Sequence, residues 1–272
     1  MDYLIKSNLL ISTGCTEPIA IAYASAVARS YLKEVPSKIS LKISKNMAKN
    51  TLCAGIPNSK FVGAAFVSAL GALYANPDEG FKLLENISEK HHEIANRFAM
   101  ENVKTEIANT DKALYIEVEM EGIRAKKQKN PCQTCNKVKI IVADGHNNIN
   151  LIELNGNVIF KSCIDVPKNE KKDNKNIQFS IKEIFEYAKE LKKLDIFKNS
   201  LDLNKKISDI GKNDNWGLNV GKNIPFRENT CLSRIISVTT SAIDARIAGA
   251  PYPAMTCTGS GNQGISTTLP VY

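Results

Sequence analysis

Residues 137–160 read KVKIIVADGHNNINLIELNGNVIF, and this stretch decides the fold class. Its two apolar runs, KVKIIVA and INLIEL, are rich in β-branched residues, which is typical of strands. The dipeptide Asn155-Gly156 follows the second run directly and precedes another β-branched run, which is typical of a two-residue hairpin turn. We therefore predict an antiparallel meander over roughly residues 103–165.

Helices are expected on both sides of this β-rich section. Residues 16–33 predict a helix that is buried nearly all round, because Arg29 is its only basic residue before Lys33. Residues 61–75 and 231–248 predict two further apolar helices.

The remaining patterns are shorter. Residues 38–44 alternate between polar and apolar side chains and predict a strand, and a helix is expected to begin within residues 78–88. Ser180 and Glu183 match a capping box and predict an amphipathic helix that runs to about Leu194. The inner face of that helix is expected to consist of Ile181, Ile184, Ala188 and Leu191.

Together these elements predict an α+β fold, in which buried helices of the N- and C-terminal thirds surround an antiparallel β-rich middle section. We expect residues 1–102 together with 176–272 to form a helical catalytic core. Residues 103–175 are expected to form a β-rich subdomain, unless the chain is one continuous domain.

The composition of the chain argues against several classes of protein. No run of about 18 apolar residues is present, so we expect no membrane span and no membrane partner. The N-terminal residues lack the pattern of a signal peptide, which predicts a cytoplasmic location. The net charge is +8, but the basic stretches at 124–129 and 168–175 contain no aromatic residue, so no nucleic-acid partner is expected.

The seven cysteines are expected to be reduced, because an odd number in a long chain argues against a disulfide framework. Cys53, Cys163 and Cys231 are expected to be small buried apolar residues. The spacing of Cys132 and Cys135 matches half a zinc site or a redox pair, but no second pair completes it. A zinc protein built on these two residues is therefore kept only as an alternative.

The first candidate for chemistry is the stretch TGCTEP at residues 13–18. Cys15 stands just before a predicted helix, where the helix dipole and free N–H groups stabilise a thiolate. This position is expected to lower the pKa of Cys15 from about 8.5 to about 7, which suits a base. A buried structural cysteine is the alternative interpretation.

The second candidate is the stretch MTCTGSGNQG at residues 255–264. Three glycines among polar side chains form a loop whose N–H groups can converge on an anion. The stretch lacks the Gly-Lys-Ser/Thr ending of a phosphate loop and the βαβ frame of a dinucleotide site. We interpret it as a carboxylate-binding loop, with a tight turn that needs glycines as the alternative. His146, between two predicted strands, is interpreted as a turn residue.

Six short motifs occur in order along the chain and together resemble a known family. They are Gly14-Cys15-Thr16-Glu17-Pro18, Asn46-x-x-Lys49-Asn50, Gly55-Ile56-Pro57, Asn155-Gly156, Asp244-Ala245-Arg246 and Ser260-Gly261-Asn262-Gln263-Gly264. The chain resembles the L-cysteine desulfidases, which are related to the α part of bacterial iron–sulfur L-serine dehydratases. The resemblance spans almost the whole chain, and its first and last motifs are the most specific.

The resemblance implies a lyase of amino-acid catabolism that converts L-cysteine to pyruvate, ammonia and sulfide without pyridoxal phosphate. It implies a four-iron four-sulfur cluster with Cys257 as a metal ligand, and it implies Cys15 as the catalytic base. It implies that a small amino-acid substrate is bound by Lys49, Asn50, Ser260, Gly261, Asn262 and Gln263. Further cluster ligands are expected beyond Tyr272, on the same chain or on a separate one, and without them the chain is expected to be inactive.

Two further alternatives to a desulfidase stay open. An enzyme of the same fold can act on L-serine, because a few pocket residues decide which leaving group is accepted. A relative without a cluster can merely bind a small amino acid. A homodimer is compatible with either alternative, because apolar helices often meet in dimers.

Overall fold

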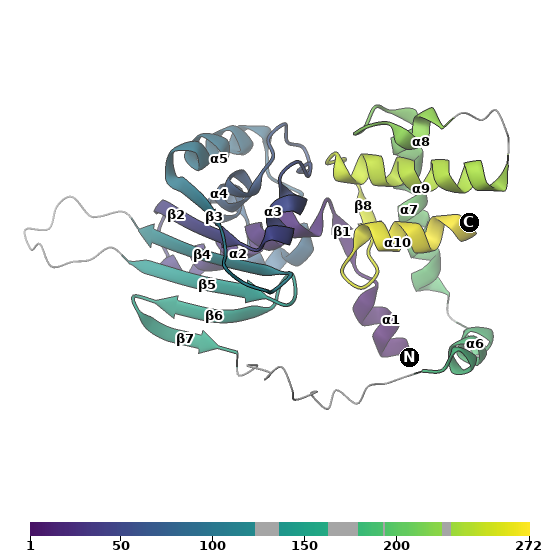
Figure 1. The fold of residues 1–272 in the computed structure, drawn as a ribbon, viewed down its shortest axis with the longest axis horizontal. Coiled ribbons are helices and arrows are strands. Elements are labelled where there is room, and N and C mark those ends of the chain that lie inside the picture. Colours follow the sequence, from purple (N-terminus) through teal and green to yellow (C-terminus); the bar gives the residue numbers. More distant parts are fainter. Residues whose placement is uncertain (123–135, 163–178, 193, 225–229) are drawn as a thin grey trace, which may run out of the picture.

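The computed structural model describes residues 1–122, 136–162, 179–192, 194–224 and 230–272, which form two lobes (Figure 1). One lobe is a six-stranded sheet with helices packed on it, and the other is a group of helices. The predicted α+β fold, with helices on both sides of a β-rich middle, is confirmed. The predictions on Cys132, Cys135 and Cys163 lie outside the described residues.

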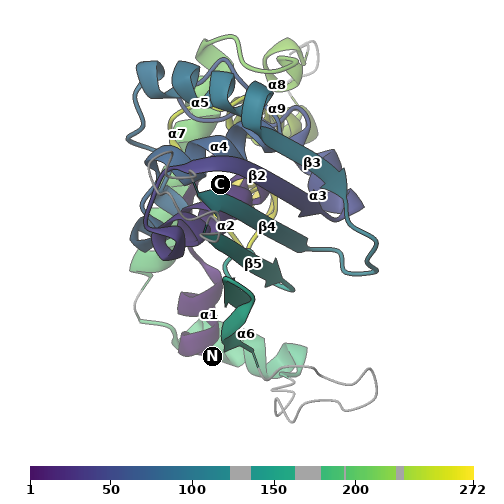
Figure 2. The ribbon, with the colours of Figure 1, turned by 90° about the vertical axis from the view of Figure 1, so that its left-hand side faces the viewer.

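The sheet places its strands in the order β3-β2-β4-β5-β6-β7. Figure 2 shows the first four of these strands, and Figure 1 shows β4 to β7. Their bounds are β2 (Pro36–Ile43), β3 (Val103–Ile107), β4 (Tyr115–Gly122), β5 (Lys137–Ala143), β6 (Ile149–Leu154) and β7 (Asn157–Lys161). From β4 to β7 all neighbouring strands are antiparallel, as the meander predicts. The turn between β6 and β7 is Asn155-Gly156, and both residues have positive φ, as this type of hairpin requires.

β3 departs from the predicted meander, because it pairs with β2 in parallel. The expectation that the antiparallel meander begins near residue 103 is therefore wrong for this strand. The chain passes from β2 through a series of helices before it reaches β3, and such a crossover returns the chain in the same direction. Since β2 lies between β3 and β4, the division predicted at residue 103 falls inside this sheet.

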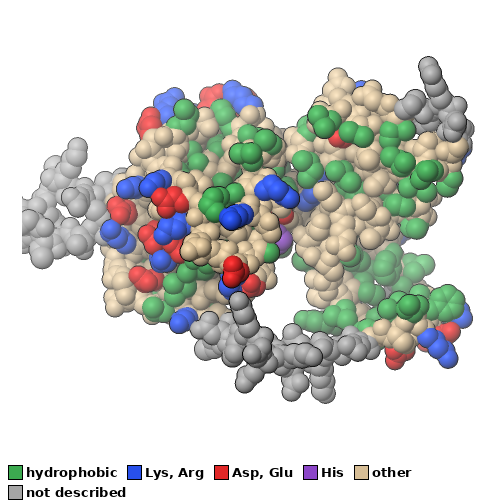
Figure 3. Space-filling model, viewed as in Figure 1, with side chains coloured by type: hydrophobic (Ala, Val, Ile, Leu, Met, Phe, Trp, Pro, Cys, Tyr) green, Lys and Arg blue, Asp and Glu red, His purple; other side chains and the backbone are tan. Residues whose placement is uncertain are grey.

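One face of the sheet is apolar and is covered by helices. The helices of this lobe are α2 (Thr16–Leu32), α3 (Lys45–Thr51), α4 (Ala64–Tyr74), the 3-10 helix η1 (Pro77–Lys82) and α5 (Glu89–Asn102). Ile116, Val118 and Met120 of β4 are fully buried in one core with α2 and α4, and α2 is buried along most of its length, as expected. The opposite face carries ion pairs such as Lys42–Glu117, and Figure 3 shows charged side chains over this lobe.

The second lobe consists of short and medium helices around a small core. Its elements are α6 (Ile181–Glu190), α7 (Asp195–Asn213), α8 (Val220–Asn223), α9 (Cys231–Ile247), α10 (Gly261–Thr268) and η2 (Leu269–Val271), with α1 (Asp2–Asn8) nearby. The core includes Ile207 of α7, Ala242 of α9 and Ile265 of α10. Across the described ranges, no helix combines the length and apolar character that crossing a bilayer requires.

Three expectations about local structure need correction. No α-helix begins within residues 78–88, where η1 is followed by α5 from Glu89. Cys53 and Cys231 are exposed rather than buried, because Cys53 follows the end of α3 and Cys231 opens α9 at the surface.

α6 begins at the predicted capping box, because Ser180 and Glu183 each accept a hydrogen bond from the other's backbone N–H. Its expected inner face is nevertheless wrong for the described structure, in which α6 buries none of its residues. Ile181 is 87% exposed, and Ile184 is 49% exposed. An amphipathic pattern predicts a helix and its apolar side, but it does not supply the surface that side packs against.

The two lobes touch along two lines of backbone contact. β1 (Ile11–Thr13) pairs antiparallel with β8 (Pro253–Met255). Next to this pair, the Gly55 N–H donates to the Ile247 carbonyl at 2.7 Å. A Cβ atom on Gly55 would stand 2.2 Å from the Ala248 carbonyl carbon, so only glycine allows this approach.

Candidate active site

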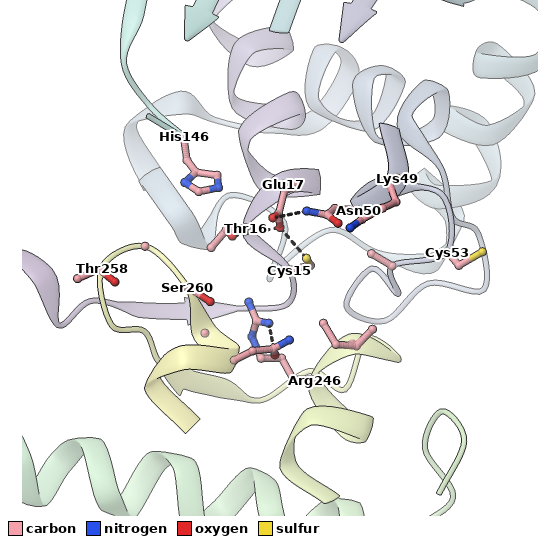
Figure 4. Close-up of a pocket in the computed structure, with 15 residues that line it drawn as sticks. Cys15, Thr16, Glu17, Lys49, Asn50, Cys53, His146, Arg246, Thr258 and Ser260 are labelled. Carbon is pink, nitrogen blue, oxygen red and sulfur yellow. Dashed lines mark hydrogen bonds between the residues drawn. The ribbon is translucent and has the colours of Figure 1, made fainter. Parts of the chain in front are cut away.

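A cavity of about 490 Å³ lies where the two lobes meet (Figure 4). The sheet lobe lines it with the start of α2, the end of α3 and the turn between β5 and β6, while the helical lobe adds the end of α9 and the start of α10. The predicted site residues that line it are Cys15, Lys49, Asn50, Ser260, Gly261 and Asn262. Gln263 and Cys257 are not among its lining residues. This size is typical of small-molecule sites.

Cys15 is held at the first turn of α2. It is the N-cap residue of that helix, in extended conformation, and the preceding Gly14 has φ +83°, which favours glycine. The side chain is buried, and its Sγ donates a hydrogen bond to Glu17 Oε2 at 2.9 Å. Cys15 is therefore positioned as a thiol directed at a carboxylate.

The Glu17 carboxylate is the centre of a small hydrogen-bond network (Figure 4). Besides the Cys15 thiol, it accepts from Thr16 Oγ1 at 3.2 Å and from Asn50 Nδ2 at 3.0 Å. Burial by itself disfavours this carboxylate, but the hydrogen bonds and the nearby His146 outweigh it, so the pKa of Glu17 is lowered. Glu17 is thus the ionised member of the pair at neutral pH.

The expectation of a low pKa for Cys15 is wrong in this environment. Burial raises the pKa of the Cys15 thiol to about 12, and the charge of Glu17 and the hydrogen bond to it add to the rise. Arg246 opposes the rise with its positive charge. The helix dipole stabilises a partly buried charge by at most about 2 kcal/mol, or roughly one and a half pKa units, which is less than these effects.

Arg246, like Glu17, lines the cavity although the sequence patterns did not assign it to the site. It closes α9, and its side chain is only 2% exposed. Its Nη1 donates to Asn262 Oδ1 at 2.9 Å, whereas Nε and Nη2 have no hydrogen-bond partner in the described part of the chain. These two nitrogens form one edge of the guanidinium, and that edge matches the two oxygens of a carboxylate.

Burial also affects the charge of Arg246 directly. The pKa of the guanidinium is lowered by burial, while its electrostatic interactions with Cys15 and Glu17 oppose this change. An arginine stays protonated even so. A buried cation with unused donors is unfavourable by itself, and an anionic ligand in the cavity would satisfy it.

The glycine-rich loop places the start of α10 against this guanidinium. Ser260 caps α10 by accepting a hydrogen bond from the Gln263 N–H at 3.2 Å. A Cβ atom on Gly261 would stand 2.2 Å from Arg246 Nε, so glycine is needed for the arginine to pack here. The Gln263 side chain accepts from Thr258 within the loop. The glycine-rich loop therefore packs directly against the Arg246 guanidinium.

His146 lies in the turn between β5 and β6, as interpreted, and from that turn it also lines the cavity. Burial lowers the pKa of His146, and the charge of Glu17 opposes the change.

Two sequence signals pointed weakly to the residues that were missed. Glu17 lies inside the GCTEP motif, and Arg246 ends the Asp244-Ala245-Arg246 motif in the last turn of α9.

The four-iron four-sulfur cluster implied by the resemblance requires several cysteine or other metal-binding side chains close together. Cys257 starts a tight turn, in which its N–H and carbonyl pair with Ser260. Within the described ranges, no three His, Cys, Asp or Glu side chains lie together so that they could hold a metal ion. These residues alone do not fit a four-iron cluster. The expectation of further ligands elsewhere stays a prediction.

Comparisons with known proteins place relatives along nearly the whole chain. A protein of Actinobacillus pleuropneumoniae serotype 5b is 32% identical over 277 residues, and one of Clostridium perfringens strain SM101 is 35% identical over 276 residues. A protein of Nautilia profundicola is 34% identical over 271 residues. All three bear the name UPF0597 protein. The chain is similar to UPF0597 proteins.

The matches cover 98% of this chain in the first two relatives and 99% in the third. The chain spans only 61% of the length of the Actinobacillus UPF0597 protein and 62% of the other two. No family model matches the chain. No solved structure matches it either. The name UPF0597 states no chemistry.

Proposed function

We propose that this chain forms the substrate-binding and proton-transfer part of a β-eliminating lyase that acts on a small amino acid, with L-cysteine as the first candidate. The observation that carries the proposal is the buried Arg246 guanidinium, whose Nε and Nη2 have no partner in the described part of the chain and which lines a cavity that also contains an ionised carboxylate. The guanidinium and the carboxylate in one cavity match the two opposite charges of an amino-acid zwitterion. The GCTEP and SGNQG motifs support the choice of class.

Arg246 is assigned the substrate carboxylate. Its Nε and Nη2 have no partner in the described part of the chain and lie buried beside Gly261, so a small shift of the loop at Gly261 would let them donate two parallel hydrogen bonds to the carboxylate oxygens. Asn262 holds Nη1 and so fixes the plane of the guanidinium. The start of α10 lines the same part of the cavity, and its free N–H groups add to the positive field.

Glu17 and Cys15 are assigned the substrate ammonium and the α-proton. The Glu17 carboxylate lines the cavity and attracts a positive group, with Asn50 holding its second oxygen. The Cys15 thiol cannot accept a proton while it holds its own. The α-proton therefore moves to Cys15 Sγ as the Cys15 proton moves to Glu17 Oε2, 2.9 Å away.

The electron pair of the broken Cα–H bond then forms the Cα–Cβ double bond, and the β-substituent leaves with the electron pair of its own bond. For L-cysteine this releases hydrosulfide and aminoacrylate, and water converts aminoacrylate to pyruvate and ammonium. An iron–sulfur cluster would supply a Lewis acid for the leaving group. The roles of Arg246, Glu17 and Cys15 do not depend on how such a group is held.

One observation favours a second candidate, which is binding without turnover. The described residues gather no set of three metal ligands, although Arg246 and Glu17 line one cavity. In that case the chain recognises the amino acid, and L-cysteine and L-serine differ only in how their β-substituents fit. Elimination then requires groups supplied from elsewhere.

The activity is tested with two proteins prepared without oxygen in the presence of iron and sulfide. They are this chain and the UPF0597 protein of Clostridium perfringens, whose longer sequence contains the matched region. Released sulfide and pyruvate are measured with L-cysteine, and pyruvate with L-serine, without added pyridoxal phosphate. We expect the Clostridium protein to consume L-cysteine. Turnover of L-serine alone contradicts the desulfidase, and turnover of neither by cluster-loaded protein contradicts the lyase class.

A further inference from the structure

Helix α6 presents an apolar stripe that no other element of the described structure buries. Ile181, Ile184 and Phe185 follow the i, i+3, i+4 spacing of one helix face, and Phe185 is 57% exposed. Figure 3 shows hydrophobic side chains gathered around this helix at the lower right. We call these three side chains the α6 face.

The sequence encodes α6 firmly, so its exposure is not a sign of a poor helix. The capping box at Ser180 and Glu183 satisfies two backbone N–H groups at its start. An isolated helix of about ten residues is nevertheless marginal in water, because most helical stability comes from packing of the apolar side. A stable α6 therefore needs a surface for the α6 face.

A groove runs beside this helix. It has a volume of about 390 Å³ and lies between α1, α6 and the start of α7. Ile5 of α1 and Ile196 and Phe197 of α7 contribute its apolar wall. Tyr187 of α6 hydrogen-bonds Asp2 of α1 across it. On the α6 side the groove is lined by Tyr187 and Glu190, so it lies along the same helix as the α6 face but includes none of its three side chains.

The charges on α6 favour a polypeptide as the occupant. Its polar side mixes Lys182 and Lys189 with Glu183, Glu186 and Glu190, so the helix has no excess positive charge. Anionic membranes and nucleic acids bind surfaces with excess Lys and Arg. A surface with an apolar stripe and similar numbers of positive and negative charges is instead typical of contacts with another protein segment.

The similar proteins indicate where such a segment occurs. This chain matches over 98% of its own length, yet it spans only 62% of the Clostridium perfringens UPF0597 protein. Almost two fifths of that relative therefore has no counterpart here, which is enough polypeptide for a further domain. We infer that the α6 face and its groove are the docking surface for an apolar helix from that remaining part of UPF0597 proteins.

Hydrogen–deuterium exchange measured by mass spectrometry tests the inference on both proteins as they exist. Peptides that contain α6 are compared between this chain and the Clostridium perfringens protein. We expect the amides of α6 to exchange more than about tenfold more slowly in the longer protein. In that protein, local unfolding of α6 also has to break the contact with the docked segment. Peptides from α2 and β4 should be protected in both proteins, which shows that both are folded.

Two outcomes overturn the inference. Equal exchange of α6 in the two proteins means that the additional polypeptide does not cover the α6 face. Slow exchange of α6 in this chain alone, with a rate that depends on protein concentration, means that a second copy covers it instead.

A pair of substitutions provides an independent arm. Ile184→Lys with Phe185→Lys should leave the urea midpoint of this chain unchanged, because both side chains are already exposed. The same changes at the aligned positions of the Clostridium protein should lower its midpoint. Lys182→Glu, on the polar side of α6, is the matched control and should change neither. An unchanged midpoint in the double-lysine Clostridium variant contradicts docking at this face.

Discussion

Cys15 and Glu17 hold one proton between them, and the sulfur keeps it. Because the pKa of Cys15 is raised to about 12, we expect almost no thiolate at pH 8, and the rate of alkylation should rise about tenfold per pH unit from pH 8 upward. Iodoacetamide labelling followed by mass spectrometry measures this rate. The exposed Cys53 and Cys231 are internal controls and should react first.

Glu17→Gln should lower the pKa of Cys15, because the substitution removes a negative charge and weakens the hydrogen-bond acceptor. We expect the labelling rate of Cys15 at pH 8 to rise by about tenfold or more, corresponding to at least one pKa unit. Glu93→Gln, which removes a carboxylate of an exposed ion pair, is the control. An unchanged labelling rate of Cys15 in Glu17→Gln would show that the two groups are not coupled.

Gly261→Ala tests how the glycine-rich loop supports Arg246. The added methyl group would occupy the space of the guanidinium, so the arginine should shift. We expect the affinity for the amino acid to fall by about tenfold or more, because a hydrogen bond from a charged donor contributes about 1.5–3 kcal/mol. Isothermal titration calorimetry measures the affinity. Ser266→Ala, at an exposed position of the same helix, should bind as the original protein does.

Sequence patterns could predict part of this site but not its electrostatics. The GCTEP and SGNQG motifs were each visible, and both line the same cavity. Arg246 could be predicted as a residue in the last turn of a helix. Its burial could not be predicted, because the sequence does not show which basic side chain becomes inaccessible to solvent in the folded protein. The pKa of Cys15 was predicted in the wrong direction, since burial and Glu17 act only once the chain is folded.

At the scale of elements, the contact of α2 with α4 depends on close backbone approach. A Cβ atom on Gly71 of α4 would stand 2.3 Å from the Ala22 carbonyl oxygen of α2. Gly71→Ala should therefore destabilise the protein by about 1–3 kcal/mol, the usual cost of overpacking. Urea denaturation measures this change. A gain of about 1 kcal/mol, as helix propensity alone predicts, would contradict the close contact.

Elements with a strong local pattern could be predicted well. α2, α4 and α9 follow from apolar periodicity, and the strands from β4 to β7 follow from alternation and the Asn155-Gly156 turn. The parallel pairing of β3 could not, because strand direction depends on a crossover through several helices. The exposure of α6 could not be predicted either, because an amphipathic pattern identifies the apolar side of a helix but not the surface on which that side packs.

At the scale of the whole molecule, the cavity exists because the lobes meet closely at Gly55. Gly55→Ala would place a methyl group 2.2 Å from the Ala248 carbonyl carbon and so push the lobes apart. Arg246 would then move away from Glu17, and amino-acid affinity should fall while each lobe stays folded. Calorimetric titration measures the affinity, and circular dichroism checks the fold. Unchanged affinity would mean that one lobe binds the amino acid alone.

The central claim is that Arg246 holds the carboxylate of a small amino acid. Arg246→Gln removes a buried cation with unused donors, so the variant should be as stable as the original chain, and urea denaturation checks this. Calorimetric titrations compare L-cysteine with cysteamine, which lacks the carboxylate.

The original chain should bind L-cysteine, and Arg246→Gln should lose about 30-fold or more of that affinity, as loss of one partner of a buried charge pair costs about 2–5 kcal/mol. Cysteamine should bind both proteins equally weakly. If a folded Arg246→Gln variant binds L-cysteine as tightly as the original chain, the account of the site is contradicted.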